Sequence, residues 1–481
     1  MATPCAPRGR SRSWCPEASV CSLSTCTDTI VRLSMKPAGL LLAASLGGCA
    51  HYAALPLPQQ AALSPDLGGL VHDRPLPAAL TVSDVVRLAV LNNPDLRAAR
   101  NRTGVAAAQL LQAGILPNPQ ASLSATPTLA GPGTTTAWNA GFTVDLRSLL
   151  MRPSAVRAAR ASKHQVEADL LWQEWQVAGQ ARLLMVQLIE EQRGLRLLDG
   201  LRQLLGGRLD ERRRALAAGD ATYATIAPDL AALTDAQTRT RDAMRLLLQQ
   251  RHRLAALLGL RPDALLVLAD CINLPPLDAG AIRTALPALP HRRPDLVALR
   301  WGYRAADEQI RSALITQFPN VSFGPTGGSD NTNVRAFGPQ LSLELPVFDR
   351  GQGRIAAARA TRQQLHDEYA ARLAAADGDV RARLDETAQL QEQVATARAQ
   401  LPAVLAAARA ADAADVSGLI DPQARIDLQV ARFTRQAELI VLQQSLLEQQ
   451  VAIETLAGTG LPPLTAADDP EPLTQIAERA P

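Results

Sequence analysis

The chain has 481 residues, of which 47% are hydrophobic and 3% aromatic, and its formal net charge is +3. This apolar content excludes an intrinsically disordered chain, and the near-neutral charge argues against binding nucleic acid through an uncompensated basic face. No apolar run reaches the ~20 residues that a membrane-spanning helix needs. Most apolar residues are alanine and leucine, which favour helices, so we expect a mainly α-helical fold.

Near the amino terminus, residues 35–49 read MKPAGLLLAASLGGC. A positive residue, a short apolar stretch and two glycines before a cysteine are typical of a bacterial lipoprotein signal. We therefore predict a signal peptide at 35–48 and acylation, palmitate included, at Cys49. The alanine that follows Cys49 favours the outer membrane. The alternative is a buried cysteine that follows an apolar stretch by chance.

The segments around this signal are assigned by exclusion and composition. Residues 1–34 do not fit ahead of a signal peptide, so they are interpreted as an upstream mis-called extension. Residues 49–80 are rich in proline, which favours extended, polyproline-like backbone, and are predicted to be a lipid anchor and tether. Residues 465–481 are interpreted as a carboxy-terminal tail.

The remainder of the chain reads as an internal duplication. Residues 92–124 and 292–324 share a Pro-Asp-Leu motif and a later proline at a constant offset of 200. The first copy is assigned to residues 81–275 and the second to 276–464. Helical sequences can resemble one another by chance, but chance would not keep one offset across several motifs.

Both copies show the same order of signals along the chain. In the first, Thr81 begins a short helix with a capping box, and Asn93 caps a second one. Alternating apolar residues then predict two strands, and long helices without loop signals follow. The expected strands and long helices are 120–128, 138–146, 154–217 and 228–258 in the first copy, and 320–326, 338–346, 354–415 and 423–457 in the second. In 423–457, apolar residues recur in the spacing of a coiled-coil seam.

Four strands are too few to close a membrane barrel, because small spanning barrels need about eight, and open edges cannot face lipid. We therefore expect three copies to share one barrel of about twelve strands. Aromatic residues gather around the strands, as an interfacial girdle would require; they are Trp138, Phe142, Phe318, Phe323, Phe337 and Phe348.

These features together resemble the TolC-like outer-membrane factors of tripartite efflux pumps. The cysteine after the signal, the NPDL and RPDL helices and the stretch LPVFDRGQGRIAAARA at 345–360 carry the resemblance, which covers 81–461. The PVFDRGQG stretch is most similar to the branch that serves heavy-metal exporters. The resemblance implies a homotrimer with a shared twelve-stranded β-barrel in the outer membrane and an α-helical barrel of antiparallel coiled coils across the periplasm. It also implies a periplasmic adaptor and an inner-membrane RND-type pump as partners.

The resemblance also points to site residues at the two turns between long helices. Candidate adaptor-docking tips are Gly219, Asp220 and Ala221 in the first copy, and Gly418, Leu419 and Ile420 in the second. The second tip matches the family's pattern of a glycine followed by small or apolar residues, and the first departs from it. Asp229 and Asp427 are candidate gate residues, because threefold symmetry would make either a ring of carboxylates. The alternatives are ordinary glycine turns and solvated aspartates.

Other functions find little support in the sequence. GQGRIA at 351–356 matches a dinucleotide-binding pattern but precedes about 60 residues of predicted helix instead of a second parallel strand. The six histidines are scattered, and no catalytic constellation is complete, so no enzyme, cofactor or metal site is expected. The main competing interpretation is a lipid-anchored periplasmic coiled-coil scaffold without a channel. It leaves the strand pairs unexplained.

Overall fold

The structure is a computed structural model that describes residues 53–130 and 135–459. The chain divides after Ala61 into two compact units, and every helix and strand below belongs to the second. The predicted extension at 1–34, the signal peptide, Cys49 and the tail at 465–481 lie outside the described residues.

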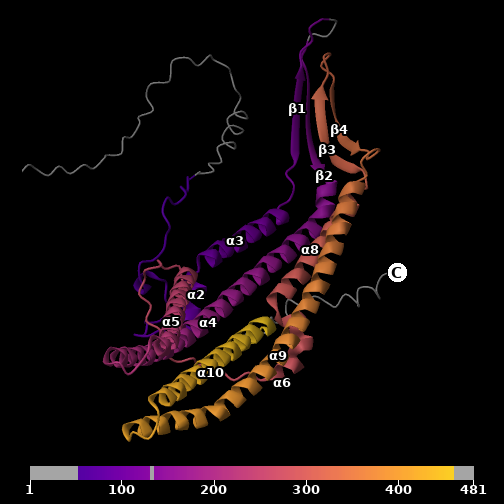
Figure 1. Cartoon of the computed structure of the whole chain (residues 1–481). Helices are drawn as coiled ribbons and strands as arrows, with labels where there is room; N and C mark the ends of the chain where they lie inside the picture. Colours follow the sequence, from indigo (N-terminus) through magenta and orange to yellow (C-terminus); the bar gives the residue numbers. More distant parts are fainter. Residues whose placement is uncertain (1–52, 131–134, 460–481) are drawn as a thin grey trace, which may run out of the picture. The chain divides into compact units, whose positions relative to one another are not determined.

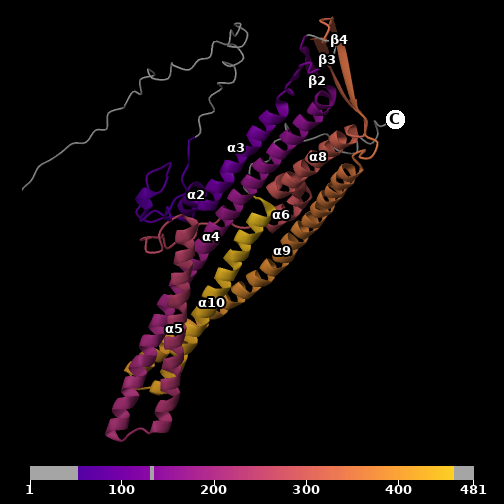
Figure 2. The same cartoon turned by 90° about the horizontal axis from the view of Figure 1, so that it is seen from above.

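The described part is mainly helical, and both copies have the predicted order of elements (Figures 1 and 2). The first copy contains α2 (Val82–Asn92), α3 (Pro94–Gly114), β1 (Gln120–Thr126), β2 (Ala137–Asp145), α4 (Leu146–Ala218) and α5 (Tyr223–Leu257). The second contains α6 (Ala279–Ala285), α7 (Leu289–Arg292), α8 (Pro294–Ile315), β3 (Asn320–Ser329), β4 (Arg335–Glu344), α9 (Gln352–Val416) and α10 (Pro422–Ala457). Short 3₁₀ turns lie at Leu67–Gly69 and Leu286–Ala288. Within 53–459, no described helix is long and apolar enough to cross a membrane.

The helix starts show where local sequence rules hold and where they mislead. Thr81 forms the expected capping box of α2, and the Asn93 side chain caps α3 ahead of Pro94. The first long helix, however, begins at Leu146 rather than at Ser154. Its start is fixed because the Asp145 carboxylate accepts hydrogen bonds from two backbone N–H groups of the first turn.

The first return helix also begins earlier than expected, at Tyr223 instead of Pro228. A capping box between Thr222 and Thr225 satisfies the backbone at this start. Pro153 in α4 and Pro228 in α5 therefore lie inside helices. A proline removes one N–H donor from a helix but does not by itself mark where the helix begins.

The four strands form one antiparallel sheet in the order β1-β2-β3-β4. The central pair joins the two copies, because Val144 of β2 pairs with Phe323 of β3. Strands β1 and β4 form the two edges of this sheet. Helix α4 follows β2 directly, and α9 follows β4 after a short connection, so the sheet lies at one end of both long helices (Figure 1).

The core consists of two clusters, one for each copy. In the first, α2 packs on α4 and α5 through residues such as Val85, Leu188 and Leu254. In the second, α6 to α8 pack on α9 and α10 through residues such as Leu296 and Ile453. The coiled-coil prediction for α10 agrees with the burial of that helix. No seam position is exposed among Ile426, Val430, Phe433, Ala437, Ile440, Gln444, Leu447, Val451 and Glu454.

The predicted tether at 49–80 is wrong in its second half, because this part packs onto the folded body. Ser64 and Leu80 form parallel bridges with Leu260 and Leu268 of the segment that follows α5. The Asn92 side chain accepts a hydrogen bond from the Val71 N–H at 2.7 Å and donates one to the Val71 carbonyl at 2.8 Å. These contacts satisfy backbone groups that a free polyproline segment would leave to water.

Candidate functional site

The register of the sheet separates its side chains by polarity. Residues that pair across strands share a face, and successive residues of one strand alternate between the faces. One face carries the apolar side chains of Leu123, Trp138, Phe142, Val144, Val321, Phe323, Phe337, Leu341 and Leu343. Leu123 and Phe337 are 80% and 83% exposed, so this apolar face lies open in the single chain.

The opposite face is polar or small. It carries Ser122, Ser124, Asn139, Thr143, Ser322, Thr326, Gln340 and Ser342. Four of the six predicted girdle aromatics lie on the apolar face, and the other two, Phe318 and Phe348, are exposed beside the strands. A sheet of this kind fits between lipid on one face and water on the other.

The two tip glycines adopt the left-handed conformation that a tight reversal requires. Gly219 has φ 86° and Gly418 has φ 66°. In each tip the residue after the glycine donates its N–H to a carbonyl of the preceding helix at 2.8 Å, from Asp220 to Ala215 and from Leu419 to Ala414. Both predicted turns are therefore present at the ends of the hairpins.

The second tip presents apolar side chains to solvent. Leu419 is 82% exposed, and Val416, which the sequence analysis did not single out, is exposed beside it. Ile420 is only half-buried. At the first tip Asp220 is exposed and Ala221 half-buried, and the exposed ring of Tyr223 follows them.

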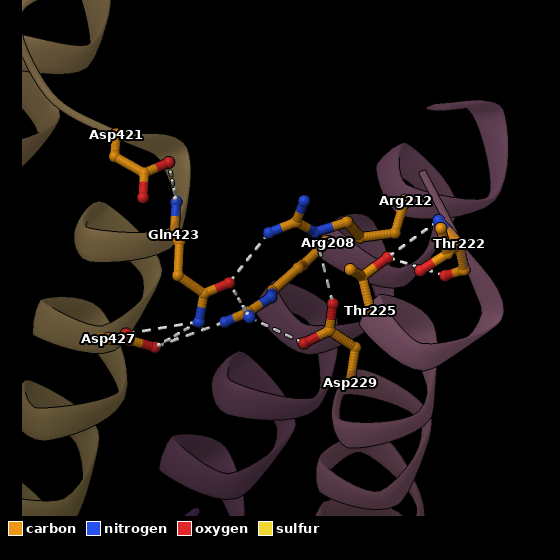
Figure 3. A network of polar contacts seen from close by, with 8 residues as sticks. All are labelled: Arg208, Arg212, Thr222, Thr225, Asp229, Asp421, Gln423 and Asp427. Carbon is orange, nitrogen blue, oxygen red and sulfur yellow. Dashed lines mark hydrogen bonds and ion pairs between the residues drawn. The ribbon is translucent and has the colours of Figure 1, made fainter. Parts of the chain in front are cut away.

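The two candidate gate aspartates lie in one polar network that joins the hairpins (Figure 3). Arg208 of α4 pairs with Asp229 of α5 at 2.7 Å and with Asp427 of α10 at 3.4 Å. Gln423 of α10 accepts hydrogen bonds from Arg208 and from Arg212, the latter at 2.9 Å. The Gln423 amide also donates to the Asp427 carboxylate at 3.1 Å.

The two carboxylates differ in their exposure to solvent. The Asp229 side chain is 5% exposed, and Arg212 approaches its second oxygen at 3.6 Å. The Asp427 side chain is 61% exposed. Asp229 therefore does not offer a free carboxylate to solvent in this structure, and its place in a threefold ring of carboxylates stays a prediction. Asp427 alone of the two remains accessible.

Sequence reasoning missed Arg208, Arg212 and Gln423. A signal for the arginines was present, because Arg208 precedes Gly219 by 11 residues and Asp229 follows it by 10. Positions at equal distance from a tight turn lie opposite each other in an antiparallel hairpin. No comparable signal links Gln423 to α4, because that contact depends on how the two copies pack.

The GQGRIA stretch, which matches a dinucleotide-binding pattern, has a structural role. Gly351 of the GQGRIA stretch caps α9 with φ 74°, and the long helix follows at once. Since the sheet is antiparallel throughout, it offers no parallel strand pair for a dinucleotide fold. In the described ranges, no group of three or more histidine, cysteine or acidic side chains is placed to hold a metal ion.

Comparison with known proteins agrees with this geometry. The family model described as "Outer membrane efflux protein" matches residues 286–459. The fusaric acid resistance protein FusA of Burkholderia cepacia is 33% identical over 159 residues, which is 30% of this chain and 29% of that protein. The chain thus aligns with less than a third of the length of this relative.

Solved structures extend the likeness over most of the chain. The outer membrane protein VceC of Vibrio cholerae superposes with a TM-score of 0.63 at 19% identity, over 78% of this chain and 96% of VceC. The CmeC outer membrane channel of Campylobacter jejuni gives a TM-score of 0.64 at 15% identity, over 89% of this chain and 98% of CmeC. The chain has the fold of these outer-membrane channels, and part of it matches the outer membrane efflux protein family. The family match lies in the second copy, and the shared fold includes the first.

Proposed function

We propose that the protein is the outer-membrane channel of a tripartite efflux system, through which solutes leave the cell passively. The observation that carries this proposal is the four-stranded sheet with one exposed apolar face and one polar face. Such a sheet costs free energy in water, because large exposed apolar patches are unfavourable there. In a membrane the apolar face contacts lipid and the polar face lines a channel.

The proposal requires more than one copy of the chain. Strands β1 and β4 are the edges of the sheet, and lipid does not tolerate unpaired strand edges. Pairing β4 of one copy with β1 of the next closes a barrel, and three copies supply about twelve strands, above the about eight of the smallest spanning barrels. The long helices then continue as a helical barrel into the periplasm, as the family resemblance implies.

The tips are proposed to meet a periplasmic adaptor that connects the channel to an inner-membrane RND-type pump. This rests on the exposed Leu419 and Val416, since apolar side chains at a tip are unfavourable without a partner surface. Asp427 and Arg208 lie near the same end of the long helices. We propose that three copies place their polar network around one axis, where it would gate the channel. The outer-membrane location and the lipid on Cys49 belong to this proposal.

Two similarities bear on the chemical class of the exported solute. The name of FusA concerns resistance to fusaric acid, which suggests small organic compounds. The stretch PVFDRGQG instead favours heavy-metal ions. A passive channel can conduct either class, since its polar wall selects by size and charge.

A deletion strain tests the proposal. Deleting the gene should sensitise cells to at least one compound in a panel of fusaric acid, common drugs and metal salts, and the wild-type gene should restore resistance. The class of compound identifies the solute. Unchanged susceptibility across the panel, with the protein shown to be expressed in the parent strain, would contradict the proposed export. ATP hydrolysis by the purified protein would contradict the passive mechanism.

A further inference from the structure

The four strands carry formal charge at only three positions. These are Asp145, the last residue of β2, Arg335, the first residue of β4, and Glu344, the last residue of β4. The residues of β1 and β3 are uncharged throughout. The register of the sheet decides which of the three charges share a face, because side chains alternate between the two faces along each strand.

Both carboxylates lie on the polar face, at the end of the sheet that leads into the long helices. Glu344 pairs with Asn320, and Asp145 pairs with Ser322, two residues farther along β3. Residues two apart in a strand point to the same side, so Asp145 and Glu344 share this face. Arg335 lies an odd number of residues from Glu344, on the apolar face and at the other end of β4.

The two carboxylates differ in what they bond. Asp145 caps α4, because it accepts hydrogen bonds from the Arg147 N–H at 2.9 Å and from the Ser148 hydroxyl at 2.5 Å. The Glu344 side chain is exposed and forms no hydrogen bond or ion pair within residues 53–130 and 135–459. Its neighbour Asn320 has a buried Oδ1 that accepts no hydrogen bond in these ranges either. This part of the polar face is therefore electronegative.

Basic side chains near this end of the sheet belong to α4 and to the stretch that leads into α9. Arg147 and Arg152 donate hydrogen bonds to backbone carbonyl groups at 2.7 Å and 2.6 Å. Arg354 pairs with Asp349 at 3.6 Å, and Arg350 is exposed. None of the four belongs to a strand, so no basic residue of the polar face offsets the two carboxylates.

We infer that Glu344 makes the channel prefer cations, an inference that rests on the proposed function. Three copies around one axis place their Glu344 carboxylates in a ring on the polar face, where the barrel passes into the helices. Rings of carboxylates favour cations in membrane channels. The exported solute is then a metal cation or a positively charged organic compound more readily than a carboxylate anion of the same size.

Reversal potentials across a planar lipid bilayer with a KCl gradient test this inference. The wild-type channel should be more permeable to K⁺ than to Cl⁻. Glu344→Gln should lower the ratio of the two permeabilities by about twofold, whereas Glu344→Asp should keep it. Adding Gln340→Glu to Glu344→Gln should restore the ratio, because Gln340 lies on the same face of β4.

Arg335→Gln is the matched control, since it removes one charge from the same strand but from the apolar face. Its permeability ratio should equal that of the wild type. Salt provides a second control, because the Debye length falls from ~10 Å at ~0.1 M to ~3 Å at ~1 M. The wild-type preference for K⁺ should therefore weaken in concentrated KCl, and the difference from Glu344→Gln should shrink with it.

Current steps with the same permeability ratio in the wild type and in Glu344→Gln would overturn the inference and leave the channel itself intact. A wild-type preference for Cl⁻ would overturn it as well. If Glu344→Gln does not insert, Ser342→Arg decides, because it adds a positive charge to the same face and should lower the ratio. A folded wild-type protein without any current steps would instead contradict the proposed function, and the inference with it.

Discussion

Arg208 and Asp229 form a buried ion pair between α4 and α5, with 2.7 Å between Nη2 and Oδ1 and side chains that are 11% and 5% exposed. Removing one partner of a buried pair leaves the other charge uncompensated and costs about 3–5 kcal/mol. Arg212 lies near Asp229 and offsets part of this loss. We expect Arg208→Ala to lower the free energy of local opening at the first tip by about 3 kcal/mol.

Hydrogen exchange of the backbone N–H groups of 223–230 measures this opening, and it should become on the order of 100-fold faster. Arg213→Ala is the control, because Arg213 and Asp210 form an exposed pair at 3.4 Å on the same helix. Exposed pairs contribute about 0–1 kcal/mol, so this variant should exchange nearly as the wild type does. Equal exchange in both variants would mean that Arg208 does not hold the tip.

The exposed apolar tip of the second hairpin is expected to bind the adaptor. Replacing Leu419 and Ile420 with aspartate should leave the protein folded in the outer membrane and abolish resistance, because the partner surface would have to bury two charges. Susceptibility of the complemented strain measures this. Ala217→Asp adds one charge near the other tip and should have a much smaller effect. Normal resistance of the double variant would rule out docking at Leu419.

The lipid anchor is expected at Cys49. Mass spectrometry of protein purified from the cell envelope should find an amino terminus at Cys49 with diacylglycerol attached and acyl chains on it. Cys49→Ser should lack this modification and keep its signal peptide. An unmodified chain that begins upstream of Met35 in the envelope would contradict both the lipid and the assigned signal.

Burial raises the pKa of the Glu190 carboxyl, and the nearby Arg193 only partly opposes this shift. Glu190 is 1% exposed in α4, and its Oε2 has no hydrogen-bond partner. A carboxyl with a raised pKa binds its proton more tightly in the folded state. Its contribution to stability is therefore present at low pH and is lost as the pH rises from the unfolded pKa through the folded pKa.

Glu190→Gln should therefore raise the midpoint of thermal unfolding at pH 8, by a few degrees for about 1 kcal/mol. The difference from the wild type should shrink as the pH falls through the folded pKa. Glu211→Gln, at an exposed position of the same helix, should change the midpoint little at either pH. A lower midpoint for Glu190→Gln at pH 8 would show that the ion pair with Arg193 outweighs the cost of burial.

The sequence was sufficient to predict elements whose signals are local. Capping residues at Thr81 and Asn93, alternation in the strands and the seam of α10 each act within a few residues of the chain. Prolines misled the prediction at α4, where the Asp145 cap decides the start. The packing of 64–80 could not be predicted, because the bridges of Ser64 and Leu80 lead to residues about 190 positions away. The link from Arg208 to Gln423 depends in the same way on contact between the copies.

The faces of the sheet were predictable in part. Alternation within one strand separates Leu341 and Leu343 from Ser342, but only the register between strands brings Phe323 opposite Leu341. The register is set by long-range pairing, so the continuous apolar face could not be read from any single strand. It is this face, rather than any one motif, that supports a channel over a scaffold.

Conductance across a planar lipid bilayer is the measurement that tests the channel most directly. Purified full chain should add discrete current steps of uniform size. Leu343→Arg should abolish the steps, because an arginine on the lipid face costs about 2–4 kcal/mol near the bilayer midplane. Ser342→Arg, on the opposite face of the same strand, should still insert and give steps. A folded wild-type protein that gives no steps, or a Leu343→Arg variant that conducts like the wild type, would contradict the account.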